Sequence, residues 1–153
     1  MEKHMELGVY SFPSRFPRLA ELYRATAKQA GHSGAGIKVS VGTLGLIAPA
    51  KGEAVERYDP GWRNIQILAI ERRGWPGPDR KFSEQQVQPP FAYYVGDPVD
   101  VARRIVDLHQ KIGRMRHFFQ MDLGGLPQEQ FLKSIELLAT EVKPRVDRLM
   151  SRL

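Results

Sequence analysis

Residues 117–127, HFFQMDLGGLP, combine groups that bind polar ligands. Gln120 and Asp122 offer an amide and a carboxylate directly after an aromatic run, while Gly124 and Gly125 let the backbone turn sharply and expose its amides. A helical pattern follows at once, and the N-terminus of a helix favours an anion or a polarised carbonyl. The segment therefore predicts a binding site, although two glycines that only make a tight strand-to-helix turn would explain the same sequence.

Other chemistries find no matching pattern. The chain has no cysteine, which excludes disulfides and thiolate metal sites. Its four histidines are spread from His4 to His117, so we expect no metal site. Ser11 and Thr43 lack the G-x-S-x-G turn of covalent serine chemistry. The glycines of residues 31–38 precede a predicted strand, whereas those of a dinucleotide-binding fingerprint follow one.

Alternating strand and helix patterns organise the chain. Apolar, β-branched runs predict strands, and apolar residues at three- and four-residue steps predict amphipathic helices. In the clearest helix the Asp97 carboxylate is placed to cap the first turn, Pro98 suits the first position, and Gly113 ends the pattern. The predicted order is strand 7–12, helix 17–30, strand 37–48, helix 52–73, helix 98–112, strand 115–123 and helix 126–142.

Prolines and glycines predict where this regularity breaks. Pro60 and Gly61 should bend or divide helix 52–73, and Pro144 should kink or end the last helix. Residues 74–90 hold four prolines and two glycines and predict an irregular excursion. We interpret this excursion as part of one domain, residues 1–153.

Strands that alternate with helices predict an α/β fold with a parallel sheet. Ligands of such sheets bind beyond the carboxyl ends of the strands. Residues 120–125 follow one predicted strand, and Ser11 and Thr43 lie near the ends of two others. We therefore expect these residues to gather at one edge of the sheet.

The net charge of +6 is distributed along the chain. Basic residues alternate with acidic ones at helical spacing, which is typical of solvated helix faces, so we expect no nucleic-acid partner. No window of 18 residues is uncharged and apolar, and residues 1–12 lack the apolar core of a signal peptide. The sequence therefore predicts a cytoplasmic protein without a membrane span.

Three segments together resemble a known family: VGDPVDVARRIVDLHQKIG at 95–113, HFFQMDLGGLP at 117–127 and SIELLATEVKPRV at 134–146. They are similar, in the correct order, to the C-terminal portion of the bacterial luciferase-like monooxygenases, which are flavin- or deazaflavin-dependent (β/α)8-barrel enzymes. Upstream, residues 14–32 look like the helix after the sixth strand of the family, and residues 39–48 look like its seventh strand.

The resemblance implies a partial TIM-type barrel, with about three parallel strands and flanking helices, and an oxidoreductase that uses FMN or coenzyme F420 on a small organic substrate. It carries over strand-end positions as cofactor contacts and identifies no catalytic residue. These positions are Tyr10, Ser11, Gly42, Thr43, Gln120, Asp122, Gly124 and Gly125, of which Ser11, Thr43, Gln120, Asp122, Gly124 and Gly125 are the predicted cofactor-binding residues.

The chain is short for this family. A complete barrel needs about 250 residues and eight strands, and much of the flavin contact in the family comes from the half that has no counterpart here. We therefore expect weak or absent flavin binding by this chain alone. An isolated piece of barrel also leaves strand edges and an apolar face uncovered, which predicts a homo-oligomer, with a dimer favoured, or a second chain that supplies the missing strands. The alternative function is a non-catalytic module that binds itself or a partner.

Overall fold

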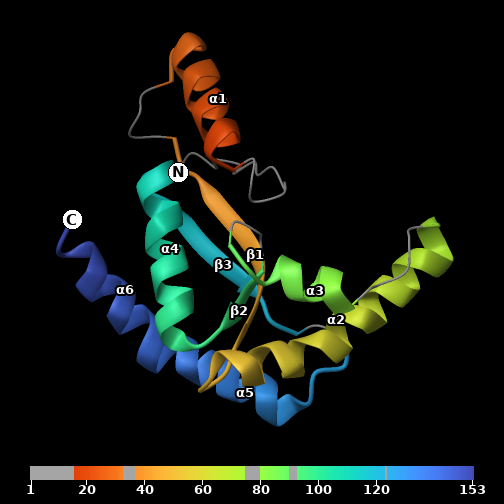
Figure 1. Cartoon of the computed structure of the whole chain (residues 1–153). Coiled ribbons are helices and arrows are strands. Elements are labelled where there is room, and N and C mark those ends of the chain that lie inside the picture. Colours follow the sequence, from red (N-terminus) through yellow and green to blue (C-terminus); the bar gives the residue numbers. More distant parts are fainter. Residues whose placement is uncertain (1–15, 33–36, 75–79, 90–92, 123) are drawn as a thin grey trace, which may run out of the picture.

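The chain folds into a small parallel sheet with helices packed around it (Figure 1), seen in a computed structural model that describes residues 16–32, 37–74, 80–89, 93–122 and 124–153. The elements in chain order are α1 (Phe16–Gln29), β1 (Ser40–Ile47), α2 (Lys51–Arg73), α3 (Arg80–Gln86), β2 (Tyr94–Gly96), α4 (Pro98–Ile112), β3 (Arg116–Gln120), α5 (Gln128–Leu137), the π-helical turn η3 (Leu138–Val142) and α6 (Lys143–Met150).

The strands are all parallel and lie in the order β2-β1-β3. Strand β1 pairs with β3 from Ser40 to Leu44 and with β2 from Gly45 to Ile47. This confirms an α/β fold with about three parallel strands and flanking helices. The strand set differs from the predicted one, because predicted strand 7–12 lies outside the described residues and the buried, three-residue β2 is too short to show a strand pattern in the sequence.

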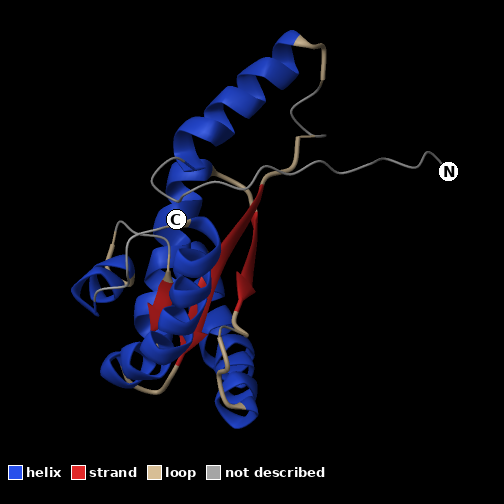
Figure 2. Cartoon of the chain, turned by 90° about the vertical axis from the view of Figure 1, so that its right-hand side faces the viewer, coloured by secondary structure: helices blue, strands red, loops and turns tan. Residues whose placement is uncertain are grey.

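One face of the sheet is covered by helices α1, α4, α5 and α6. Val41 and Ile47 of β1 point to this face, together with Met121 just after β3. Figure 2 shows the sheet from the side, with α1 projecting beyond its upper end. The apolar stripe of α4 provides much of the packing, and its members are Val101, Ala102, Leu108 and Ile112.

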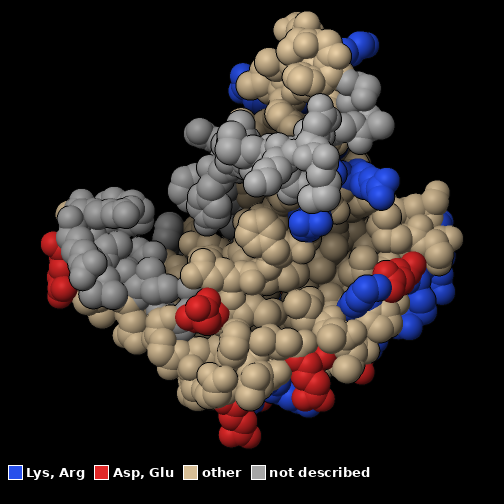
Figure 3. Space-filling model, turned by 180° about the vertical axis from the view of Figure 1, so that it is seen from behind, with Lys and Arg blue, Asp and Glu red and all other residues tan. Residues whose placement is uncertain are grey.

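The other face is covered over its carboxyl half. Leu44 and Leu46 pack there against a second apolar cluster that includes Tyr58 and Trp62 of α2. Farther toward the start of the strands, the ring of Phe118 lies over Gly42, where an added Cβ would be 2.5 Å from the ring. Phe118 remains 55 % exposed. Seen from behind (Figure 3), the centre of the molecule carries mainly uncharged side chains.

The helix ends follow the predicted capping in α4. The Asp97 carboxylate accepts hydrogen bonds from the backbone N–H groups of Val99 and Asp100, and Gly113 ends the helix at φ 81°. A backbone conformation with positive φ is one that glycine adopts at little cost. The sequence therefore located both ends of α4 correctly.

The structure contains helix at all three places where the sequence predicted a break. Helix α2 is not divided at Pro60, because Pro60 and Glu56 are both exposed and water can satisfy the carbonyl that loses its N–H partner. Residues 74–90 contain the short helix α3. Pro144 does not end the last helix, since the π-helical turn precedes it and Pro144 lies in the first turn of α6, where a missing N–H costs little.

Candidate functional site

The glycine turn follows the carboxyl end of β3, as predicted. Gly124 and Gly125 have φ of 53° and 89°, a region that side chains disfavour, so both glycines are required by the backbone. The Asn64 amide Nδ2 of α2 donates to the Gly124 carbonyl over 2.8 Å, which ties the turn to α2. Gln120 and Asp122 are exposed beside it, so an amide and a carboxylate are open to a ligand here.

Thr43 lies elsewhere. It occupies the middle of β1, opposite Phe119, and it is 5 % exposed on the face that the helices cover. Its Oγ1 is 2.9 Å from Nε2 of His117, which belongs to the neighbouring strand β3. The expected position of Thr43 at the strand-end edge is therefore corrected, because the register of β1 places it within the sheet and its hydroxyl is engaged by His117. Ser11 and Tyr10 lie outside the described residues.

An aromatic cluster surrounds this hydrogen bond. His117 stacks on Phe119 with ring centroids 4.4 Å apart, and the Tyr94 ring meets His117 edge-on at 4.7 Å. Gly45 makes room for the cluster, since a Cβ there would lie 2.9 Å from the Phe119 ring. The Arg104 guanidinium lies 4.8 Å from the Tyr94 centroid and donates to the Val87 carbonyl, so the cluster joins all three strands to α4.

Burial dominates the electrostatics of the cluster. It raises the pKa of Tyr94 to about 12 and lowers the pKa of Arg104, partly opposed by Asp100. Burial also lowers the pKa of His117 to about 4. Its Nδ1 is buried without a hydrogen-bond partner among the described residues, so a second ring proton would have no acceptor. Neutral His117 is therefore a structural group that links two strands.

We expect the free energy of unfolding to fall by about 2 kcal/mol between pH 7 and pH 4 because of His117. The folded pKa of about 4 lies below the ordinary value of 6.5, so only the unfolded chain takes up a proton in this range. Proton uptake then favours unfolding, and the stability is retained above pH 6.5. The expected loss of about 2 kcal/mol is smaller than the pKa shift alone would give, because the half-buried His117 side chain keeps some contact with solvent. Urea unfolding at the two pH values measures it.

The matched variant is His117→Gln, which keeps a hydrogen-bonding group for Thr43 and does not titrate. Its stability should fall by about 2 kcal/mol less than that of the parent over the same range. Replacing the exposed His32 by Gln should preserve the parent profile. Equal pH dependence in the parent and His117→Gln would contradict the assignment.

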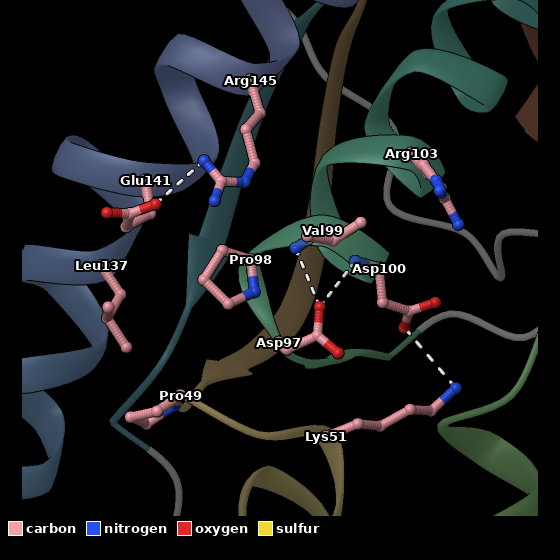
Figure 4. Close-up of a pocket in the computed structure, with 10 residues that line it drawn as sticks. All are labelled: Pro49, Lys51, Asp97, Pro98, Val99, Asp100, Arg103, Leu137, Glu141 and Arg145. Atoms are coloured by element: carbon pink, nitrogen blue, oxygen red, sulfur yellow. Dashed lines mark hydrogen bonds and ion pairs between the residues drawn. The ribbon is translucent and has the colours of Figure 1, made fainter.

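A hollow of about 570 Å³ opens at the carboxyl ends of β1 and β2 (Figure 4). It lies on the side where α4 packs against η3 and α6, and the glycine turn is not among its lining residues. Its volume suits a small molecule. The lining residues are Pro49, Lys51, Asp97, Pro98, Val99, Asp100, Arg103, Leu137, Glu141 and Arg145.

Most charges in the hollow are already compensated. Lys51 lies 3.7 Å from Asp100, and Arg145 lies 2.9 Å from Glu141. Asp97 is occupied as the helix cap, as Figure 4 shows. Sequence reasoning missed this hollow because its residues come from segments far apart along the chain. A strand assigned to residues 94–96 would have indicated it, since Asp97 then follows the end of a parallel strand.

No known protein family and no curated protein matches the sequence at a significant level. Solved structures do match its fold. Monooxygenase RslO1 from Streptomyces bottropensis aligns over 86 % of this chain with a TM-score of 0.67 and 21 % identity. Coenzyme F420 dependent tetrahydromethanopterin reductase from Methanopyrus kandleri aligns over 89 % of this chain with a TM-score of 0.57 and 21 % identity.

A third similar structure is a type II Baeyer-Villiger monooxygenase, the oxygenating constituent of 3,6-diketocamphane monooxygenase from Pseudomonas putida, in complex with FMN. It aligns over 90 % of this chain with a TM-score of 0.57 and 23 % identity. The chain spans 38 %, 43 % and 41 % of the three proteins. It therefore has the fold of part of a luciferase-like monooxygenase, as the resemblance predicted, and identity this low establishes the fold alone.

The exposed groups near the glycine turn can form hydrogen bonds with a polar ligand. Gln120 can both donate and accept hydrogen bonds, and the Asp122 carboxylate can accept them from hydroxyl groups. Residues 120–122 and 124–126 include no basic side chain, and the charge of Asp122 opposes a phosphate. The turn thus suits a ligand that carries amide and hydroxyl groups better than it suits a phosphate. Within the described residues no group of three metal-binding side chains occurs, and no helix is long and apolar enough to span a membrane.

Proposed function

We propose that this chain forms part of a cytoplasmic flavin- or deazaflavin-dependent oxidoreductase of the luciferase-like monooxygenase type. The observation that carries the proposal is the fold likeness to enzymes whose names include FMN and coenzyme F420, over most of this chain. Gln120, Asp122 and the turn at Gly124 and Gly125 would contact the cofactor, because they are accessible at the carboxyl end of a parallel strand. The bound cofactor would supply the redox chemistry, and the protein would orient it.

The chain covers less than half of each similar enzyme, so we propose that a second copy or another chain completes the site. A specific observation supports this. Phe118 is 55 % exposed, and its ring lies over Gly42. Among the described residues, no helix covers this half of the sheet face. The same observation favours the second candidate function, a non-catalytic module whose sheet face binds itself or a partner.

Titration of FMN fluorescence with the purified chain tests the cofactor proposal. We expect saturable but weak quenching and no stoichiometric yellow complex, because the turn offers groups for the ring edge and hydroxyls and none for the phosphate. Asp122→Ala should weaken binding by roughly two- to tenfold, the value of one hydrogen bond. A parallel titration with coenzyme F420 compares the two cofactors.

Glu129→Ala is the matched control, because Glu129 is an exposed acid in the first turn of α5 beyond the glycine turn. It should bind FMN as the parent does. Absence of quenching at about 1 mM chain, a concentration at which even a binding energy of roughly 4 kcal/mol is detected, would count against the cofactor proposal. A tight stoichiometric complex would instead show that the chain alone holds a complete site.

A further inference from the structure

A second, narrower groove runs between α4 and α6. Its volume is about 190 Å³, and it joins the larger hollow through Val99, Arg103 and Arg145, which line both. Its floor is apolar, with Val99 and Ala102 from α4 and Leu149 from α6. Arg148 and Arg152 complete its walls, so the groove is lined by four arginines and by no acidic residue.

Three of these arginines have no internal counter-charge. Arg145 is paired with Glu141, whereas Arg103, Arg148 and Arg152 form no ion pair with any part of the chain that the structure describes. Elsewhere on α6, Lys143 is paired with Asp147 at 2.7 Å. The groove therefore differs from the ordinary charged face of the same helix, where opposite charges alternate.

The spacing of these arginines does not stabilise the helix. Arg148 follows Arg145 by three positions on α6, and like charges at such spacing on a helix repel each other. Arg152 lies just beyond the end of α6 and adds a further positive charge to the same groove. A bound anion would remove this repulsion. Guanidinium groups match the oxygen geometry of phosphate and bind it through paired hydrogen bonds, which an apolar floor strengthens by excluding water.

We propose that the groove between α4 and α6 binds the phosphate group of a small molecule, with Arg103, Arg148 and Arg152 as the binding residues. The groove has the volume of about six water molecules, which suits a phosphate or a diphosphate. The site goes beyond the proposed cofactor contacts, since it shares no residue with the glycine turn.

Calorimetric titration of the full chain with inorganic pyrophosphate, at constant ionic strength, tests the site. We expect saturable one-site binding and a higher melting temperature in pyrophosphate, because a ligand that binds only the folded state stabilises it. Arg148→Gln and Arg152→Gln should each weaken binding on the order of tenfold. Lys143→Gln, which removes the same charge from another face of α6, should bind within about twofold of the parent.

Folding is not expected to obscure the result, since Arg148 and Arg152 are both exposed and form no ion pair with the described residues, so the variants should melt close to the parent without pyrophosphate. Equal weakening by Lys143→Gln would overturn the proposal, because it would show a diffuse charge effect. Absence of pyrophosphate binding together with binding to phosphatidic acid vesicles, or to a single-stranded oligonucleotide, would also overturn it in favour of a membrane or nucleic-acid surface.

Discussion

Gly45→Val is expected to lower the free energy of unfolding by about 3 kcal/mol, the upper range for forcing extra carbons into a packed core. A Cβ at this position would lie 2.9 Å from Cδ1 of Phe119 and 3.4 Å from the Tyr94 carbonyl oxygen. Both atoms have little freedom to move. Cδ1 of Phe119 lies close to the backbone of its own residue, and the Tyr94 carbonyl belongs to the paired strand β2. Urea unfolding followed by circular dichroism measures the loss.

Gly52→Val is the matched control, because nothing lies within 4 Å of a Cβ added at Gly52 on α2. Its stability should stay within about 0.5 kcal/mol of the parent or rise slightly, since valine has a better helix propensity than glycine. Combining Gly45→Val with Phe119→Leu should recover part of the loss by removing the ring edge. If Gly45→Val alone melts like the parent, the cluster does not pack over Gly45 as described.

The second large effect is expected in assembly. Light scattering at micromolar concentration should give twice the monomer mass of 17.4 kDa, because the described residues leave part of one sheet face and the outer edges of β2 and β3 without a cover. Phe118→Asp should return the mass to that of the monomer. A carboxylate at the centre of an apolar interface would weaken association by at least about a hundredfold, or roughly 3 kcal/mol.

Leu132→Asp provides the control for this experiment. Leu132 is 55 % exposed, as Phe118 is, but it lies on α5, away from the uncovered face. The Leu132→Asp variant should keep the dimer mass. A parent chain that scatters as a clean monomer, remains so on dilution and melts cooperatively would show that the chain closes its own core and that the assembly prediction is wrong.

The sequence predicted the elements whose signals are local. The cap at Asp97, the stop at Gly113 and the apolar stripe of α4 all lie within one helix, and each was recognisable without knowledge of the fold. The same holds for the glycine turn after β3. The glycines of β1 have a structural role as well, because aromatic rings of β3 approach the backbone closely at Gly42 and Gly45.

Features that depend on register or on distant segments were not predictable in this way. Strand β2 has three residues and is stabilised by pairing with the carboxyl end of β1, a partner about 50 positions earlier in the sequence. The sequence pattern placed Thr43 near a strand end, and only the pairing of β1 with β3 shows that its hydroxyl meets His117. The hollow and the groove between α4 and α6 are both lined by residues of these two helices. No local sequence pattern indicates that the two helices lie side by side.

The end of β1 is held by a side chain from α5. The backbone N–H of Ile47 donates to Ser134 Oγ over 2.7 Å, and both residues are almost completely buried. If α5 detached, it would leave this buried N–H without an acceptor and expose the apolar neighbours Met121 and Leu137 in the same event. The final third of the chain and the central strand are therefore expected to open and close as one cooperative unit. The glycine turn between β3 and α5 is then held at both of its ends, and it should keep its shape while the loops fluctuate locally.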